Sequence, residues 1–444
     1  MLRAVVVVAG VLALAGCSGA EADQVRRPAG EHVTIRVPAD APTISAAVSV
    51  ARQGDLVLVA PGTYHESVRI TTAHVTLRGE SRDQVVIDGE LRQPNGIVVT
   101  APGVAVENLT VRGNTQNGVL VTGSVKAADT QPGQGGYDTG DEPVRFLDSF
   151  LVSHVTSTRN GLYGIYAFSA RNGVIRDSYT SGGADSGIYV GQCKPCHVVV
   201  QDNVAEYNAV GIEGTNASGE MYFVRNRIVG NRVGLTTGSD HQEKLLPQQG
   251  AVVAGNLIAA NQQPATPEQA DGGWGIGVGI DGGSNNQLLN NRITGNANAG
   301  VVLTATQDIP ANANQITANA FAGNAVDVGW TFPTATKGHN NCLTGPTVRT
   351  VPAGLTTTAP CPQPGAPLPP SAAAVSPSGT WTPPTPPAGI PFSEVAAPPA
   401  QPQLPNPTTT APTTVPPTPP LPNLTRMTPP PPTLLAALSL THIN

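Results

Sequence analysis

The sequence predicts an all-β fold, a right-handed parallel β-helix, and three observations lead to this prediction. A unit of about 23 residues recurs through the middle of the chain, and such a period is typical of a stacked solenoid. Each unit holds three short stretches rich in Val and Ile, with no helical periodicity between them. Glycine and asparagine return at equivalent places in successive units, where a coil of strands has to turn.

The repeat is clearest where the units carry no inserted loop, as in "YGIYAFSARNGVIRDSYTSGG". Asn208 and Asn231 lie one repeat apart, and Asn261, Asn296 and Asn324 continue the same column with longer gaps. Neighbouring strands in a sheet lie about 4.8 Å apart, so equivalent side chains of successive turns come into contact. We therefore expect these asparagines to stack in a ladder that bonds the backbone of the next turn.

Residues 32–361 form the predicted β-helix domain, and each end of it carries a closing element. "TISAAVSVARQ" predicts a short amphipathic helix, which would cover the open edge of the first turn. Cys342 and Cys361 flank a short loop at the other end. Paired cysteines are typical of proteins outside the cytoplasm, so we expect a disulfide that fastens the last turn.

The N-terminus predicts export and lipid anchoring. Residues 1–16 carry one positive charge and an apolar stretch too short for a stable transmembrane helix, as in a signal peptide. Leu14-Ala15-Gly16-Cys17 resembles a bacterial lipobox, in which Cys17 is lipidated after cleavage. The alternative is an ordinary signal peptide that contains a cysteine. With residues 17–31 as a tether, we expect the protein at the outer face of the bacterial cytoplasmic membrane, in the cell envelope.

The C-terminal segment 362–444 differs in composition from the rest of the chain. It holds more than half of the 43 prolines and only two charged residues, Glu394 and Arg426. Proline favours an extended polyproline II backbone and prevents regular strand pairing. We expect a disordered tail, which serves either as a passive spacer or as a source of proline motifs for a partner.

The charge of the chain excludes one class of partner. The formal net charge is −6, the isoelectric point is near 5.7, and no basic run occurs. A nucleic-acid-binding surface needs clustered lysine and arginine. We therefore expect no nucleic-acid partner.

Several stretches resemble known families. "TISAAVSVARQGDLVLVAPGTYHESVRI" is similar to the opening of pectin-lyase-like β-helix proteins, which include pectinesterases and periplasmic nitrous-oxide-reductase accessory proteins. "NGLYGIYAFSARNGVIRDSYTSGGADSGIYVGQ" and "AEYNAVGIEGTN" resemble a family of exported bacterial parallel β-helix repeat proteins, often lipoproteins. The resemblance covers residues 40–345 and implies the fold. It implies no activity, because the paired aspartates of pectinesterases and the Asp-Pro-His-Asp element of mannuronan epimerases are absent.

One column of outward-facing residues suggests a site. When the repeats are aligned on their first strand, the column consists of Tyr166, Tyr189, Glu213, Thr236 and Asp281. This alignment predicts that Glu213 and Asp281 lie about 9–10 Å apart, near the wide limit for the two acids of an inverting glycosidase. The tyrosines would stack on a sugar ring, with Asp185 and Gln192 beside them as further substrate contacts. The alternative is a solvated column without chemistry.

The residues Cys193-Lys194-Pro195-Cys196-His197 form a motif with several meanings. Cys-x-x-Cys-His attaches haem in some exported proteins, and it can also exchange metal or form a local disulfide. In the repeat the two cysteines fall at an ordinary turn, which offers no haem pocket, and no second Cys-x-x-Cys exists to complete a zinc site. We favour a local disulfide, with metal handling as the alternative.

These observations predict a function at the level of a ligand class. We expect recognition or processing of an envelope or extracellular polysaccharide, with no cofactor and no metal ion. The loop residues Asp240, His241 and Glu243 could bind a metal or act as acid and base, but we favour a solvated insertion for this loop. If the protein is an enzyme, Glu213 and Asp281 are its expected catalytic pair in a hydrolase, lyase or epimerase. The other hypothesis is a scaffold or metalloenzyme-accessory protein that binds an envelope protein.

Overall fold

The computed structural model describes residues 31–129, 143–346, 349–362 and 381–436. The chain divides into two units, residues 1–31 and residues 32–444, and only the second is described below. The predicted signal peptide and the lipidation site at Cys17 lie outside the described residues. Within the described residues, no helix is both long enough and apolar enough to span a bilayer.

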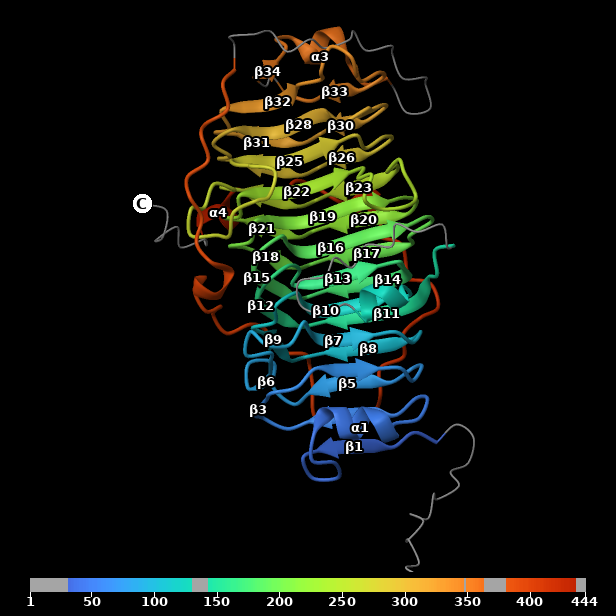
Figure 1. The fold of residues 1–444 in the computed structure, drawn as a ribbon. Coiled ribbons are helices and arrows are strands. Elements are labelled where there is room, and N and C mark those ends of the chain that lie inside the picture. Colours follow the sequence, from blue (N-terminus) through green and yellow to red (C-terminus); the bar gives the residue numbers. More distant parts are fainter. Residues whose placement is uncertain (1–30, 130–142, 347–348, 363–380, 437–444) are drawn as a thin grey trace, which may run out of the picture. The chain divides into compact units, whose positions relative to one another are not determined.

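The second unit is a parallel β-helix built from three long sheets (Figure 1). Successive strands of the chain fall in successive sheets, so each turn of the coil adds one strand to each sheet, and we call such a turn a rung. Sheet A contains β1 (Thr34–Val37), β2 (Leu56–Val59), β5 (Thr76–Gly79), β8 (Val104–Glu107), β11 (Leu147–Ser153), β14 (Ala170–Arg176), β17 (Val198–Gln201), β20 (Met221–Val224), β23 (Ala251–Ala254), β26 (Gln287–Leu289), β30 (Gln315–Thr317) and β33 (Cys342–Thr344).

The other two sheets complete each rung. Sheet B contains β3 (Gly62–Tyr64), β6 (Val85–Asp88), β9 (Thr110–Arg112), β12 (Thr156–Asn160), β15 (Tyr179–Gly183), β18 (Val204–Ala205), β21 (Arg227–Val229), β24 (Leu257–Ala259), β27 (Arg292–Thr294) and β31 (Ala320–Ala322). Sheet C contains β4 (Val68–Ile70), β7 (Asn95–Val99), β10 (Asn117–Thr122), β13 (Ile165–Phe168), β16 (Ser186–Cys193), β19 (Val210–Ala217), β22 (Val233–Gly238), β25 (Ile276–Asp281), β28 (Ala299–Thr306), β32 (Val326–Trp330) and β34 (Thr350–Val351). The short strand β29 (Ile309–Pro310) pairs antiparallel with β28.

Few helices accompany the sheets in the described residues. They are α1 (Ile44–Val50), α2 (Val125–Ala128), α3 (Leu355–Thr358), α4 (Thr433–Ala436) and the 3₁₀ turns η1 (Phe392–Glu394) and η2 (Leu424–Arg426). The helix α1 is the predicted N-terminal cap and lies at the first rungs (Figure 1). Glu66, which lies between β3 and β4, accepts hydrogen bonds from the backbone N–H groups of Ile44 and Ser45. These bonds fix the start of the helix.

The interior of the coil is filled by stacked aliphatic side chains. In sheet C, six inward-facing residues of successive rungs lie opposite one another and are all fully buried. They are Ile165, Ile188, Ile212, Leu235, Val278 and Val301. Each such side chain removes apolar surface from water, at roughly 25 cal/mol per Å². The alternating pattern of the sequence therefore produces one continuous core along the solenoid.

The predicted asparagine ladder is confirmed. The side-chain N–H of Asn208 donates to the carbonyl oxygen of Asn231 at 3.1 Å, and the same contact continues to Asn261, Asn296 and Asn324. A second ladder at the preceding turn joins the side chains of Asn203, Asn226, Asn256, Asn291 and Asn319. These carboxamides also bond backbone groups of the neighbouring rungs, so they satisfy the buried polar groups of the corners.

The disulfide between Cys342 and Cys361 is present, as predicted. It joins β33 to the segment that follows α3, and the backbone N–H of Leu343 donates to Ala359 in the same place. The last rung is thus closed by a covalent bond and by a short helix.

The C-terminal segment differs from the expectation of disorder in its described part. Residues 381–436 are extended, as their proline content predicts, but they lie against the β-helix (Figure 1, orange to red). Hydrogen bonds join this segment to distant residues of the coil, from Asn298, 83 positions away in the sequence, to Thr34, 376 positions away. The cause is that its many carbonyl groups find donors on the outer surface of the coil. We call residues 381–436 the strap.

Candidate functional site

The outer face of sheet C carries the predicted site residues, but in two columns instead of one. Glu213 pairs with Tyr189 on one side and with Thr236 on the other. Thr236 then pairs with Gly279, whereas Asp281 pairs with Gly238. The prediction that Asp281 continues the column of Glu213 is therefore wrong.

The register sets the separation of the two acids. Asp281 lies two rungs from Glu213 and two residues further along the strand, so their Cα atoms are about 12 Å apart at the usual strand dimensions. The two acids are thus further apart than the separation of about 9–10 Å that the sequence alignment predicted. Both side chains still point outward, because a shift of two residues along a strand keeps the face unchanged.

The two tyrosines of the column form part of a buried aromatic cluster. Tyr166 is 4% exposed and Tyr189 is 2% exposed. Their ring centroids are 5.1 Å apart, and Tyr163 lies 4.4 Å and 4.7 Å from the same two rings. Ala127 and Ala128 of α2 pack on this cluster. The rings therefore form a covered apolar cluster on the outer face of sheet C instead of offering the predicted platform for a sugar.

Glu213 lies beside this cluster in a partly exposed position and is held in one orientation. Ser186 donates a hydrogen bond to Glu213 Oε2 at 2.5 Å, and Thr215 donates to Glu213 Oε1 at 2.8 Å. Burial and the neighbouring charge of Asp185 raise the pKa of Glu213 to about 8, although the two hydroxyl groups act in the opposite direction. Glu213 is therefore mainly a neutral, proton-bearing carboxyl group at pH 7.

Asp185 shares the environment of Glu213. The Ser186 hydroxyl that bonds Glu213 lies 3.4 Å from Asp185 Oδ1. Burial raises the pKa of Asp185, and the charges of Asp271 and Asp240 add to the effect. Two acids that share one hydroxyl contact cannot both ionise easily, so the pair holds a proton readily.

Glu243 is a third acid of the same surface, and the sequence pattern did not indicate its position. It is 3% exposed, and its Oε1 accepts a hydrogen bond from the hydroxyl of Tyr189. Burial raises the pKa of Glu243 well above its ordinary value, and the nearby Glu213 contributes. Its Oε2 is buried without a hydrogen-bond partner in the described part of the chain, as suits a neutral carboxyl group. We name Asp185, Glu213 and Glu243 the acid cluster.

Asp281 forms a separate acidic position further along sheet C. Burial and the charge of Asp271 raise its pKa to about 6. It is partly exposed, like Glu213 and Thr236, so these outward side chains line the part of sheet C that solutes can approach. Thr304 pairs with Asp281 on the next rung and continues this surface.

Gln192 is placed inside the structure. Its side chain donates to the hydroxyl of Ser169 at 2.9 Å and accepts from the backbone N–H of Lys244 at 2.8 Å, and the residue is fully buried. Gln192 therefore anchors the loop that carries Glu243. The structure gives it a positioning role where the sequence predicted a substrate contact.

The loop residues Asp240, His241 and Glu243 point to different partners. Asp240 caps the backbone N–H of Gln242, and His241 Nε2 lies 2.9 Å from Asp308 Oδ1. Glu243 is turned inward to Tyr189. Among the described residues, no group of three His, Cys, Asp or Glu side chains is arranged to hold a metal ion.

The Cys-x-x-Cys-His motif forms a disulfide between Cys193 and Cys196, as the favoured alternative predicted. Both cysteines are fully buried in the core at the end of β16. His197 Nδ1 contacts Glu220 Oε2 of the next rung. The motif is thus a covalent corner of the solenoid.

Comparisons with known proteins agree with this architecture. Residues 95–246 match the family model described as the right handed beta helix region. No curated protein matches the chain.

Solved structures similar to the chain include three from carbohydrate biochemistry. The A-module of the mannuronan C-5 epimerase AlgE4 from Azotobacter vinelandii has a TM-score of 0.41 and 14% identity, over 67% of this chain and 85% of that one. The pectate lyase Pel9A has a TM-score of 0.37 and 14% identity, over 69% and 70%. XylC in complex with xylose has a TM-score of 0.44 and 9% identity, over 75% and 78%. No residue role or activity follows at this level of similarity.

The three parallel sheets extend the matched architecture on both sides of residues 95–246, from β1 to β34. The described part of residues 32–361 is therefore a right-handed parallel β-helix.

Proposed function

We propose that this protein recognises and processes an envelope or extracellular polysaccharide on the outer face of sheet C. The observation that carries the proposal is the outward, partly exposed carboxyl group of Glu213, which Ser186 and Thr215 hold in one orientation. Burial and the charge of Asp185 raise its pKa to about 8. A carboxyl group that is neutral at pH 7 can protonate a glycosidic oxygen. It can also protonate a carbanion at C5, the carbon next to the carboxylate of a uronic-acid residue. Partly exposed side chains along the same face, Thr236, Asp281 and Thr304, would contact the sugar chain.

Each residue of the acid cluster has a different role in the proposed reaction. Glu213 is the proton donor in this proposal, since it is both oriented and partly exposed. Asp185 keeps the proton on Glu213 through its charge, and buried Glu243 supports the tyrosine cluster beneath. Asp281 lies too far away to act on the same bond as Glu213, so it contributes to binding of the next sugar unit.

We also propose where this function operates. The lipobox-like Leu14-Ala15-Gly16-Cys17 supports a lipid anchor at Cys17, which would hold the β-helix at the outer face of the cytoplasmic membrane. Polysaccharides of the cell envelope are the glycans present at that surface. Mass spectrometry of the membrane fraction, compared between the natural chain and a Cys17→Ala variant, tests this placement.

Product analysis by NMR tests the function. The protein is incubated with a panel of neutral and uronic-acid polysaccharides, and new reducing ends, unsaturated uronates or inverted C5 protons are measured together with line broadening of the glycan. We expect one glycan to be converted and Glu213→Gln to lower the rate about 10²- to 10⁴-fold, since general acid catalysis contributes that much. Glu220→Gln, at an exposed position outside sheet C, is the matched control.

The other outcomes are equally informative. Broadening without products would show a binding module and would remove the catalytic part of the proposal. Equal turnover by the natural protein and Glu213→Gln would show that the proton donor is elsewhere. The absence of both conversion and broadening would contradict the carbohydrate function.

A further inference from the structure

The strap follows the outer surface of the β-helix in two limbs. The first limb begins at Trp381, whose indole N–H donates to Asn298, and it passes η1 against β12 and β15 before it reaches Arg82 (Figure 1). The chain turns near Thr410, which accepts a hydrogen bond from Thr34 of the first rung. The second limb returns along sheet A, as far as the hydrogen bond from Arg292 to Pro430. The strap therefore contacts rungs from one end of the coil to the other.

Arginine side chains of the coil supply the donors that the strap needs. Proline has no backbone N–H, so a proline-rich segment offers carbonyl acceptors without intrinsic partners. Five arginines donate to these carbonyl groups: Arg78 to Thr409 and Ala411, Arg82 to Pro402, Arg159 to Val395, Arg232 to Pro387, and Arg292 to Pro430. We name the surface formed by these five arginines the arginine track.

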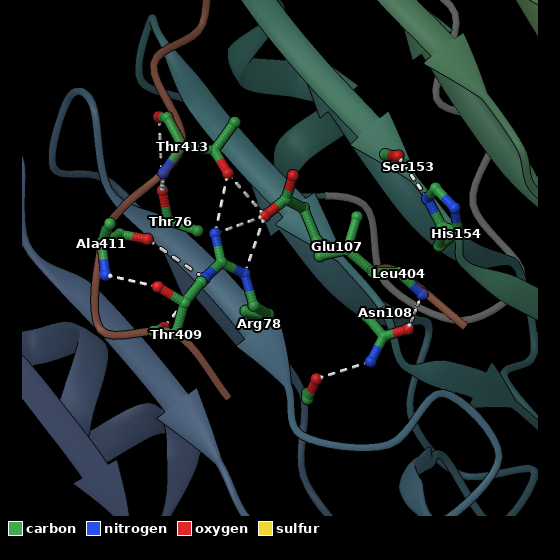
Figure 2. Close-up of polar contacts among 11 residues, drawn as sticks. Thr76, Arg78, Glu107, Asn108, Ser153, His154, Leu404, Thr409, Ala411 and Thr413 are labelled. Atoms are coloured by element: carbon green, nitrogen blue, oxygen red, sulfur yellow. Dashed lines mark hydrogen bonds and ion pairs between the residues drawn. The ribbon is translucent and has the colours of Figure 1, made fainter. Parts of the chain in front are cut away.

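Arg78 shows how closely the track fits the strap (Figure 2). Its guanidinium bonds Glu107 at 3.0 and 3.1 Å, and it also donates to two strap carbonyl groups at 3.1 Å. Thr413 completes the group, because its hydroxyl accepts from Arg78 and donates to Glu107, each at 2.8 Å. With the strap in place, Arg78 is 3% and Glu107 1% exposed. A buried ion pair needs such additional hydrogen bonds to offset its lost hydration.

A second polar contact lies just before this one in the strap. The backbone N–H of Arg82 donates to the side chain of Gln403 at 2.7 Å, and its guanidinium donates to Pro402 at 2.9 Å. Asn108 accepts from the backbone N–H of Leu404 at 2.8 Å (Figure 2). The coil thus pairs with both donors and acceptors of the strap backbone, at positions fixed by its corners.

Apolar contacts add side-chain selectivity. Val415 packs on Ala105 and Leu151, which face outward from sheet A and are separate from the interior core. Met427 packs on a second outward group, which consists of Val199, Val224, Val252 and Ala254. These apolar residues on the outside of a sheet are explained by the strap that covers them.

We propose that the arginine track is a binding site for extended proline- and threonine-rich polypeptides, and that the strap is an exchangeable ligand which occupies it in cis. The ligand class follows from the chemistry on both sides. The track offers guanidinium donors at intervals to a backbone poor in N–H groups, one hydroxyl-binding position at Arg78 and Glu107, and apolar contacts between them. A segment of this kind from another protein would compete with the strap for the same surface.

The experiment uses the full chain with a protease site inserted between residues 363 and 380, cleaved after folding. A fluorescent peptide of residues 381–436 is then added, and its incorporation is followed by anisotropy. We expect the cleaved strap to stay bound at first and to be replaced by the labelled peptide, and an unlabelled peptide of residues 401–416 to compete.

Variant peptides test recognition without any change in the folding of the coil. A competitor peptide with Thr413→Val keeps the shape but lacks the hydroxyl, and we expect it to compete about ten- to a hundredfold more weakly, since a hydrogen bond to a charged group is lost. A peptide with Thr408→Val is the matched control, because Thr408 is exposed and its hydroxyl makes no hydrogen bond within the described part of the chain. On the protein side, Arg78→Lys should weaken incorporation, whereas Arg92→Ala, on a side chain 80% exposed, should not.

Three outcomes would overturn the proposal. If the cleaved strap never exchanges with the labelled peptide while the protein stays folded, the strap is a permanent part of the fold and no ligand. If the strap dissociates and no peptide binds, or if the Thr413 and Thr408 variants compete equally, the track does not recognise this class of polypeptide.

Discussion

At the scale of single residues, the main feature of the outer face of sheet C is a set of acids whose pKa values are raised. Glu213, Asp185 and Glu243 lie around one tyrosine cluster, and burial is the largest cause of the raised pKa of each. Water is replaced there by aromatic rings and by a few hydroxyl groups, which solvate a carboxylate poorly. Burial therefore favours the protonated form of these three acids, although the net charge of the protein is negative.

The raised pKa of Glu213 makes the free energy of unfolding depend on pH in a defined direction. Glu213 releases its proton near pH 8 in the folded protein but near its ordinary value of 4.5 in the unfolded chain. Between these values the folded state binds the extra proton, so the free energy of unfolding falls as pH rises, by up to about 1.4 kcal/mol per pH unit for this group. Below pH 4.5 the contribution is fully present.

Urea unfolding at pH 5 and pH 8 checks this. We expect the natural protein to lose stability between the two values and Glu213→Gln to lose less, because the amide has no proton to release. Glu31→Gln, at an exposed position outside the site, should follow the natural protein. An identical pH dependence in all three proteins would contradict the raised pKa of Glu213.

At the scale of the elements, the corners hold the rungs together as much as the strands do. Each ladder asparagine bonds the next asparagine and also the backbone of adjacent rungs. A turn that bends the chain leaves backbone groups without strand partners, and a stacked carboxamide satisfies them at every rung. The ladder thereby fixes the register between corners.

Removal of an interior ladder residue should be costly. Asn231→Ala leaves the partners of a fully buried carboxamide unsatisfied, and we expect a loss of about 2–4 kcal/mol. Asn324→Ala, at the half-buried end of the same ladder, should cost about 1 kcal/mol, since water can replace its bonds. Chemical denaturation followed by circular dichroism measures both variants, and equal losses would show that burial in the ladder does not matter.

At the scale of the whole second unit, the strap joins rungs that the solenoid itself connects only through nearest neighbours. Solenoids gain stability from local interfaces, so distant rungs are normally independent. Val395 of the strap is fully buried against the rungs of Arg159 and Gly182, and Arg159 donates to its carbonyl group at 2.7 Å. The strap therefore contacts rungs near both ends of the coil, at Thr34 and at Asn298, and we expect it to couple them.

Proteolysis after Glu394 reports on this coupling. Arg159→Ala removes the hydrogen bond next to that residue, and we expect an acid-specific protease to cleave there about tenfold faster or more, because the opened state is more populated. The product is identified by its mass. Arg92→Ala should leave the rate unchanged, and an unchanged rate in Arg159→Ala would show that the strap is not held at this position.

The sequence by itself determined the features that repeat locally. The strands and the asparagine column from Asn208 to Asn324 follow from a period that is visible within one or two units. The cap at α1 and the disulfide corner at Cys193 and Cys196 follow from short local motifs. Three features were decided only by the tertiary structure. Asp281 lies outside the column of Glu213. A slip of two residues keeps the inward and outward faces unchanged, so the pattern of one strand cannot reveal it. Glu243 became buried because Gln192 anchors its loop. The position of the strap could not be predicted, because an extended proline-rich chain has no periodic face of its own. Its partners, such as Arg78, also lie hundreds of residues away in the sequence.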